Sequence, residues 1–330
     1  MLNSKRFGKL TLFFLPLCFL SYSNANSQDI HKYLHAMSTL KTFSFANSQP
    51  NLTAVKGFQK GDKFEIVTIF NTVEQEEDWI KLGWSVKLSG TITSQWEVTN
   101  VNPSTISFEH SIKKIKTEMS VPLANPIPFD SEKEEDFKNK DNRVVAEALK
   151  NIYSINLDAN GVIKNVLKDK LNPNTGIDSV TEYQSGAMLM LDEGNLPDIG
   201  NVFSLKIALP KNPAVNNNWI STVSKDDEKR TTSYTIKQIS DADVTLDYKI
   251  EDSTLIVIKK DEKVNKLTVK CLTNGTVTID KKTEIIKQYN AEALTTFHIE
   301  IIDSKTSNII TDTDILKIKD NATVTVKTLK

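Results

Sequence analysis

Cysteine and histidine are the residue types best suited to nucleophilic or metal chemistry, and this chain of 330 residues has two cysteines and four histidines. Cys271 and His298 occur in the same half of the sequence, so a thiol activated by an imidazole base is the first chemistry to weigh. No family motif for a nucleophilic cysteine surrounds Cys271, which ends the alternating run Leu267 to Cys271. We therefore interpret Cys271 as a strand residue and expect no cysteine catalysis.

A metal site is the second chemistry to weigh. His31 and His35 are four residues apart and would share one face of a helix. No glutamate follows His31 directly and no third ligand is near, so this pair lacks the ligand set of a zinc site. The chain also lacks the glycine-rich phosphate loops and the nucleophile-elbow motif, and with only 11 glycines we expect no cofactor.

Paired carboxylates that cleave glycosidic bonds are defined by their distance in space and leave no spacing in the sequence. Asp241 with Asp243, and Asp312 with Asp314, are interpreted as turn residues, because aspartate readily bonds its own backbone in turns. A hydrolase of envelope carbohydrate that uses such a pair therefore stays open as the alternative function. The enzyme question is left open, and a non-enzymatic role is favoured.

The N-terminus has the layout of a secretory signal peptide. Lys5, Arg6 and Lys9 precede the apolar run Leu10 to Leu20, and small residues follow up to Ala25. We predict removal of residues 1–25 and export to the periplasm or cell envelope, with no transmembrane segment in the mature chain. Lipidation at Cys18 is the alternative; it fits less well because the bulky Leu17 occupies a position that should be small.

Composition narrows the partners. The chain is 39% apolar and 25% charged with a formal net charge of -1, which describes an ordinary globular protein without a basic surface for nucleic acid. After cleavage Cys271 is the one remaining cysteine, so no intramolecular disulfide is expected.

Short alternating runs rich in β-branched and aromatic residues dominate the mature chain, and Asn160-Gly161 and Asn274-Gly275 are both typical of hairpin turns. The pattern predicts an N-terminal helix and linker (26–56), a first β module (57–168) with a helical insertion (120–152), a connector (169–212) and a second β module (213–330).

The two modules resemble each other. Without a gap, the alignment places Trp96 on Tyr234, Phe108 on Leu246 and His110 on Tyr248. Further upstream, Gly61 to Phe64 corresponds to Asn216 to Trp219. A duplicated β module is therefore predicted, with generic strand patterning as the alternative explanation.

We predict a mainly β fold, β-rich α+β, in which two related antiparallel modules form curved sheets or an open barrel or sandwich with a few short helices. A curved sheet offers one concave apolar face, on which a lipid, another apolar ligand or a segment of an envelope protein could be captured. The residues predicted to line that face are Trp96, Phe108, Met190, Tyr234 and Leu246.

Five short landmarks follow one another in the sequence: Phe129-Asp130-Ser131, Leu157-Asp158-Ala159-Asn160-Gly161-Val162, Leu209-Pro210, Pro213-Ala214-Val215 and Trp219. In this order they resemble an uncharacterised family of secreted proteins and lipoproteins common in Bacteroidota. The chain departs from that pattern at Asn217 and Asn218, where the family has Gly-Asp. The resemblance implies export and a β-rich fold, and it implies no activity.

Overall fold

The computed structural model describes residues 57–76, 82, 84–120, 122–123, 125–138, 149, 152–158, 163–168, 205, 207, 209–225, 228–260 and 263–329. The predicted signal peptide, the N-terminal helix and Met190 lie outside these ranges. The predictions made for them stay predictions.

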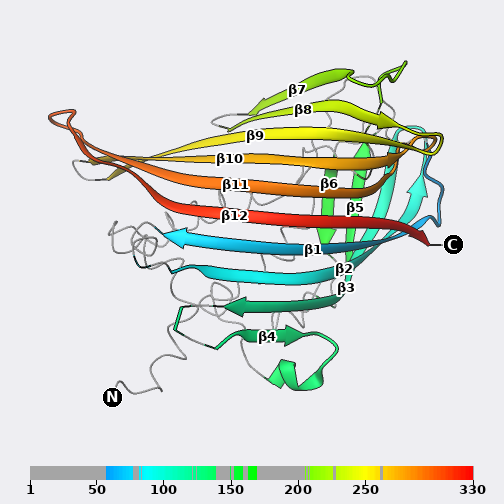
Figure 1. Ribbon diagram of the computed structural model, residues 1–330, viewed down its shortest axis with the longest axis horizontal. Coiled ribbons are helices and arrows are strands. Elements are labelled where there is room, and N and C mark those ends of the chain that lie inside the picture. The colour runs from blue at the N-terminus through cyan, green and yellow to red at the C-terminus, as the bar shows by residue number, and fades with distance from the viewer. Residues whose placement is uncertain are drawn as a thin grey trace.

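The described residues form one antiparallel sheet of 12 strands (Figure 1). The strands are β1 (Lys63–Glu76), β2 (Val86–Val101), β3 (Thr105–Ser120), β4 (Ile127–Asp130), β5 (Ile152–Asp158), β6 (Ile163–Lys168), β7 (Asn218–Lys225), β8 (Glu228–Ile239), β9 (Asp243–Lys260), β10 (Lys263–Asp280), β11 (Ile286–Asp303) and β12 (Ile309–Leu329). Their order is β6-β5-β3-β2-β1-β12-β11-β10-β9-β8-β7, with β4 paired to β3. The sheet curves strongly, so that β5 and β6 stand behind β10 to β12 in Figure 1. The mainly β, curved-sheet fold class is therefore confirmed, and the two modules form one continuous sheet.

The modules repeat each other strand by strand. The strands of the first module lie in the order β6-β5-β3-β2-β1, and those of the second module lie in the order β11-β10-β9-β8-β7, with β12 between the two modules. In these two orders β6 corresponds to β11, and so on to β1 and β7. The pairing of β2 with β3 shifts register between Val98 and Asn100, and that of β8 with β9 shifts between Ile236 and Gln238. Because the alignment places Val98 on Ile236, each hairpin carries its β-bulge at the corresponding residue.

The turn that leads into each module is also repeated. Gly61 donates its N–H to the Val98 carbonyl at 2.8 Å, and Asn216 donates its N–H to the Ile236 carbonyl at 2.8 Å. Gly61 and Asn216 have φ angles of 93° and 69°, a left-handed conformation that glycine and asparagine adopt most readily. These shared details agree with the sequence alignment.

Several local predictions were wrong. Asn274 and Gly275 lie in the middle of β10, and the turn after that strand is made by residues 281–284, where Glu284 has φ 59°. Ile152, expected at the end of a helix, begins β5. Within the predicted helical insertion, the described residues form β4 and a 3-10 helix at Glu134–Lys138, and most of the expected helix lies outside the described ranges.

Asp280 organises the turn between β10 and β11. Its carboxylate accepts hydrogen bonds from the backbone N–H groups of Lys282 (3.0 Å) and Thr283 (2.8 Å), and the Lys287 ammonium lies 3.2 Å away. These bonds, led by the one from Thr283, lower the pKa of Asp280 to about 2.

We expect Asp280→Ala to lower the free energy of unfolding by about 1–2 kcal/mol at pH 7, measured by urea denaturation. Because the pKa in the folded protein lies below that of the unfolded chain, the contribution is complete above about pH 4 and is lost as the pH falls towards 2. An unchanged unfolding curve at pH 7 would contradict this role.

Candidate functional site

We call the face of the sheet that carries the apolar clusters the inner face, and the opposite one the solvent face. Two large clusters cover the inner face at one end of the strands. The first-module cluster contains Phe58, Phe64, Trp96, Val98, Ile106, Phe108, Tyr153, Ile155, Leu157 and Leu205. The second-module cluster contains Ile207, Tyr234, Ile236, Val244, Leu246, Tyr248, Ile250, Val277, Ile279, Ile286 and Ala291. Val326 packs against both, so the two clusters adjoin.

Each cluster contains one row of side chains that runs across four neighbouring strands. The first aromatic row is Phe64 on β1, Trp96 on β2, His110 on β3 and Tyr153 on β5, each in register with the next. The second row, at the corresponding positions, is Trp219 on β7, Tyr234 on β8, Tyr248 on β9 and Gly275 on β10. The duplication thus places two equivalent rows on one apolar face.

Polar atoms of these rows are buried without a partner. Both imidazole nitrogens of His110, the Trp219 indole nitrogen and the Tyr234 hydroxyl are shielded from solvent and make no hydrogen bond in the structure. Most buried polar groups are paired, and leaving one unpaired costs about 1–3 kcal/mol. Three such residues in equivalent rows are the most unusual feature of the described part of the chain.

Packing fixes the position of each of these residues. The His110 ring lies 4.4 Å from that of Trp96 and 6.1 Å from that of Tyr153, measured between ring centroids. Trp219 and Tyr234 stack at 5.2 Å with an interplanar angle of 24°. These ring contacts do not involve a hydrogen bond from His110, Trp219 or Tyr234.

Burial keeps these groups uncharged. It is the main cause that lowers the pKa of His110 to about 3, and the positive charge of Lys113 lowers that pKa further. The imidazole is therefore neutral at pH 7 and offers one donor and one acceptor. Burial also raises the pKa of Tyr234, so its hydroxyl remains a donor.

Tyr248 differs from its neighbour in the same row. Its hydroxyl donates to the Asn290 backbone carbonyl at 3.2 Å. The Tyr248 side chain passes over Gly275. A Cβ atom added at Gly275 would lie 2.6 Å from the Tyr248 hydroxyl oxygen and 2.0 Å from the Asn290 backbone oxygen. Only glycine fits at this position, and Tyr248 is satisfied where Tyr234 is not.

Four of the five residues predicted to line a ligand site lie in the two clusters. Trp96 and Phe108 occur in the first, and Tyr234 and Leu246 at the aligned positions in the second. All four are buried, with at most 4% of each exposed, so their role in ligand binding stays a prediction. The polar members His110 and Trp219 were missed, although the sequence alignment of His110 with Tyr248 already marked one of them.

Three described residues cover the two rows. Phe58 meets the rings of Phe64 and Phe108 edge-on at 5.7 Å and 5.4 Å. Leu205 and Ile207 belong to the first and second clusters, and the Ile207 N–H donates to the Glu284 carbonyl at 3.2 Å. These three side chains therefore pack against members of the two clusters on the side of the inner face.

An ion pair lies on the same face. The Nε atom of Arg230 donates to both carboxylate oxygens of Asp252, at 2.7 Å and 2.9 Å. Both side chains are largely buried and their charges offset each other. The inner face also carries two acidic side chains, the buried Glu74 and Asp320, which accepts a hydrogen bond from Thr72 at 2.5 Å.

The structure does not bring together the residues that the other candidate chemistries would need. Cys271 is buried on the inner face, where burial raises the pKa of its thiol, whereas His298 projects from the solvent face between Asp312 (2.7 Å) and Asp314 (3.0 Å). Both carboxylates lie inside β12, so the prediction that they are turn residues was wrong. Among the described residues, no three His, Cys, Asp or Glu side chains gather as metal ligands would.

The described part of the chain contains no helix with the length and apolar character needed to cross a membrane.

Comparison with known proteins adds little. No protein-family model matches the sequence, and no curated protein sequence matches it either. Among solved structures, a lipovitellin described for its lipid–protein interactions is 11% identical with a TM-score of 0.43, covering 82% of this chain and 25% of that one. The β-domain of a Bordetella autotransporter is 6% identical (TM-score 0.22; 80% and 99% covered), and an outer-membrane channel from Pseudomonas putida F1 is 6% identical (TM-score 0.18; 84% and 100% covered). The chain spans about a quarter of lipovitellin, and scores this low support no inference about function.

Proposed function

We propose that this chain is an exported, non-enzymatic binding protein that holds a neutral lipid against the inner face of its curved sheet. One observation carries the proposal: three residues with unpaired hydrogen-bonding atoms, His110, Trp219 and Tyr234, pack against the two apolar clusters of the inner face. A ligand with an apolar body and a small polar head would satisfy both parts of that face.

The donors suggest the chemistry of the head group. The Trp219 indole is a donor only, and the Tyr234 hydroxyl is kept protonated by burial. Both would donate to an ester carbonyl, and the acyl chain would lie on the adjoining aliphatic residues. Because Arg230 is already held by Asp252, an anionic head group would have to compete with that carboxylate for the guanidinium. Acylglycerols and other neutral ester lipids fit best, and the bilayers of the cell envelope would supply them.

The proposal is tested by native mass spectrometry of the mature protein purified from the exported fraction, followed by solvent extraction. We expect a co-purifying neutral lipid of defined mass, or saturable binding of added monoolein by the delipidated protein. The intact mass also distinguishes cleavage after Ala25 from lipidation at Cys18. A protein that carries nothing and binds no monoolein would overturn the proposal; sugar release from envelope glycans by the same sample would favour the hydrolase alternative.

Removing an unpaired donor separates binding from folding. We expect Tyr234→Phe and Trp219→Phe to leave the ligand-free protein as stable as the parent or more stable, because each deletes a buried polar atom without a partner. Affinity for monoolein should fall about 5- to 10-fold in each variant, the effect of one lost hydrogen bond, when measured by titration calorimetry.

Tyr248→Phe is the matched control. It removes a hydroxyl from the same row, but that hydroxyl already donates to Asn290. We therefore expect lower stability and unchanged monoolein affinity. Loss of affinity in this variant together with full affinity in Tyr234→Phe would reverse the predicted pattern.

A further inference from the structure

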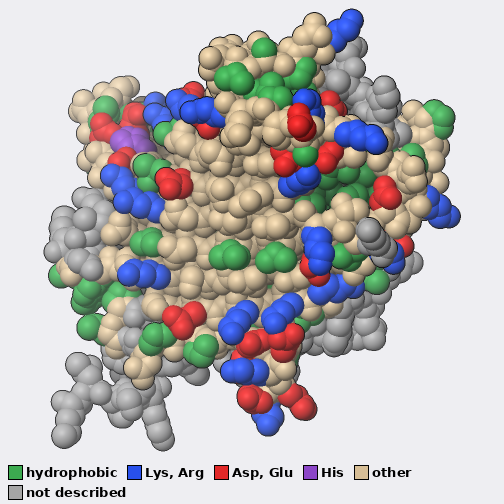
Figure 2. Space-filling view, turned by 45° about the vertical axis from the view of Figure 1, so that its right-hand side comes forward, with side chains coloured by type: hydrophobic (Ala, Val, Ile, Leu, Met, Phe, Trp, Pro, Cys, Tyr) green, Lys and Arg blue, Asp and Glu red, His purple; other side chains and the backbone are tan. Residues whose placement is uncertain are grey.

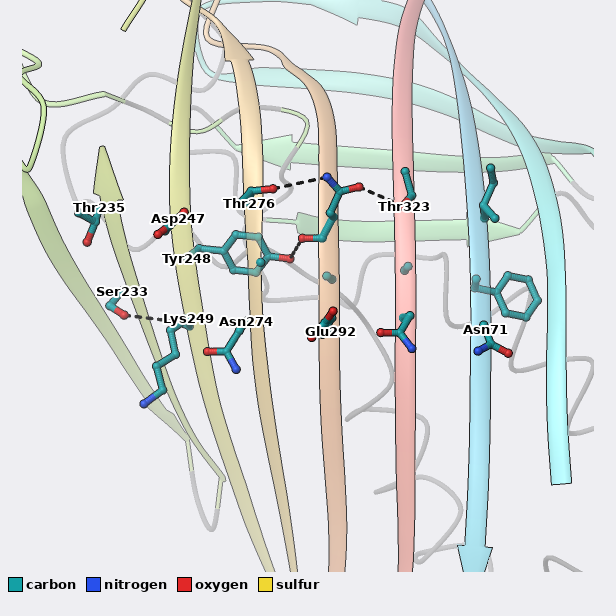
Figure 3. A pocket seen from close by; sticks show the side chains of 17 residues that line it. Asn71, Ser233, Thr235, Asp247, Tyr248, Lys249, Asn274, Thr276, Glu292 and Thr323 are labelled. Atoms are coloured by element: carbon teal, nitrogen blue, oxygen red, sulfur yellow. Dashed lines mark hydrogen bonds between the residues drawn. The ribbon is translucent and has the colours of Figure 1, made fainter. Parts of the chain in front are cut away.

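The solvent face carries a trough with a volume of about 780 Å³ that crosses the middle of the sheet from β8 to β1 (Figure 3). This volume is within the roughly 300–1,000 Å³ of typical small-molecule sites. Gly275, Ala291 and Ala322 also line the trough, and the methyl groups of the two alanines are buried on the inner face. Tyr248 and Gly275 of the second aromatic row also border the trough, whereas the other members of both rows, including His110, Trp219 and Tyr234, do not line it.

The residues that line the trough are unusual for strands. Asn71, Asn274, Asn290 and Asn321 all line it, and each lies in the interior of a long strand. Figure 3 labels two of them, Asn71 and Asn274. Asparagine is depleted in strands, so four asparagines close together in neighbouring strands are unexpected from β-strand propensity alone. Positions where a sequence breaks a local rule are often functional sites.

Three of these amides lie on one line across the strands and remain free to bind. Asn71 pairs in register with Asn321 of the next strand, and Glu292 separates Asn321 from Asn274 along the same line. Among the described residues, none of these four side chains has a hydrogen-bond or ion-pair partner.

Asn290 is oriented by its neighbours. Its amide donates to the Thr276 hydroxyl at 3.4 Å, and its carbonyl oxygen accepts from the Thr323 hydroxyl at 3.0 Å (Figure 3). The trough therefore combines one fixed amide with three free ones, each of which can both donate and accept.

The charge of the trough excludes most ligand classes. Asp247 is paired with Lys237 at 2.8 Å, and Lys249 with Glu251 at 2.6 Å, so the described residues that line the trough include no unpaired cation to attract a phosphate or a nucleic acid. Figure 2 shows the centre of this face covered mainly by uncharged side chains and backbone, with charged side chains mostly around its margin. An extended peptide is disfavoured too, because the backbone groups of these central strands are already used in the ladders.

We propose that the trough is a second binding site, for a neutral carbohydrate. Each sugar hydroxyl both donates and accepts, which matches the amides of Asn71, Asn274 and Asn321. The site is independent of lipid binding on the inner face, and neither needs the other.

Titration of the mature protein with maltohexaose, cellohexaose and chitohexaose tests the proposal. We expect at least one to bind with millimolar affinity or better. The double variant Asn274→Thr/Asn321→Thr should weaken that binding at least about 10-fold, since threonine removes the amides while favouring the strand conformation. Asn100→Thr, at an exposed position of β2 outside the trough, is the matched control and should bind like the parent.

A cationic ligand is the competing assignment, and hexaglucosamine, the deacetylated and positively charged form of chitohexaose, tests it. Glu292→Gln removes the charge of the trough at that position and keeps the shape. Tighter binding of hexaglucosamine than of every neutral oligosaccharide, with that preference lost in Glu292→Gln, would overturn the neutral assignment; binding of a neutral oligosaccharide without such a preference supports it. Failure of all three oligosaccharides to bind at about 10 mM, or unchanged affinity in the double variant, would overturn the site itself.

Discussion

Between pH 6.5 and about pH 4, we expect His110 alone to make the free energy of unfolding fall by about 1.4 kcal/mol for each pH unit. The imidazole has a pKa of about 3 in the folded protein, whereas the unfolded chain takes up the proton near its ordinary value of 6.5. In this window the unfolded state therefore binds more protons, and stability rises with pH. Urea unfolding at half-unit pH steps measures the slope.

His110→Phe is the variant that isolates this effect. Phenylalanine keeps the contact with Trp96 and has no nitrogen to leave unpaired, so its stability at pH 7 should equal or exceed that of the parent. At pH 4.5 the variant should be more stable by about 2–3 kcal/mol. Parallel pH profiles for the two proteins would contradict a buried neutral His110.

Other titrating groups act in different windows. His298 has a raised pKa because of Asp314 and Asp312, so its contribution is complete below pH 6.5 and is lost only as the pH rises through the raised pKa. Carboxylates with lowered pKa values, such as Asp280 and Asp303, lose their contribution below about pH 4. The interval between pH 6.5 and 4.5 thus separates His110 from these three groups.

We expect Gly275→Ala to lower the free energy of unfolding by about 3 kcal/mol or more, a large loss for the addition of one methyl group. An added Cβ would lie 2.0 Å from the Asn290 backbone oxygen and 2.6 Å from the Tyr248 hydroxyl. Relief requires β10 to separate from β11, or Tyr248 to give up its hydrogen bond. Urea denaturation measures the loss.

Gly61→Asn is the matched control, because the second module already has an asparagine at the corresponding position. The corresponding residue in the second module is Asn216, with φ 69°, and the space around a Cβ at Gly61 is open. We expect a loss below about 1 kcal/mol. Equal losses in the two variants would show that backbone freedom, and not the crossing of Tyr248, is what Gly275 provides.

The sequence was sufficient for the class of fold and for the relation between the modules. Strand alternation is a local property, and aligning Val98 with Ile236 needed no knowledge of the sheet. The hairpin prediction at Asn274-Gly275 failed because Asn-Gly is a strong turn signal only as far as neighbours in sequence decide the conformation. In the folded sheet the glycine makes room for Tyr248 from the adjacent strand, and the asparagine faces the trough, both of which depend on partners distant in sequence.

The candidate sites were only partly predictable for the same reason. Trp96 and Tyr234 were placed on the apolar face from strand alternation. Whether a buried polar atom finds a partner depends on the whole fold, so nothing local distinguishes the unpaired Tyr234 hydroxyl from the paired Tyr248 hydroxyl. The grouping of Asn71, Asn274 and Asn321 in the trough was also not predictable from the sequence, because these residues come from β1, β10 and β12.

The most direct test of lipid capture on the inner face is the indole N–H spectrum of the mature, 15N-labelled protein during titration with monoolein. The chain has four tryptophans, and Trp219→Phe identifies the signal of the one in the second aromatic row. If the lipid binds there, the Trp219 signal moves downfield as its N–H acquires an acceptor, while that of Trp84, outside both rows, stays in place. A Trp219 signal that does not respond to saturating monoolein would contradict lipid capture on this face.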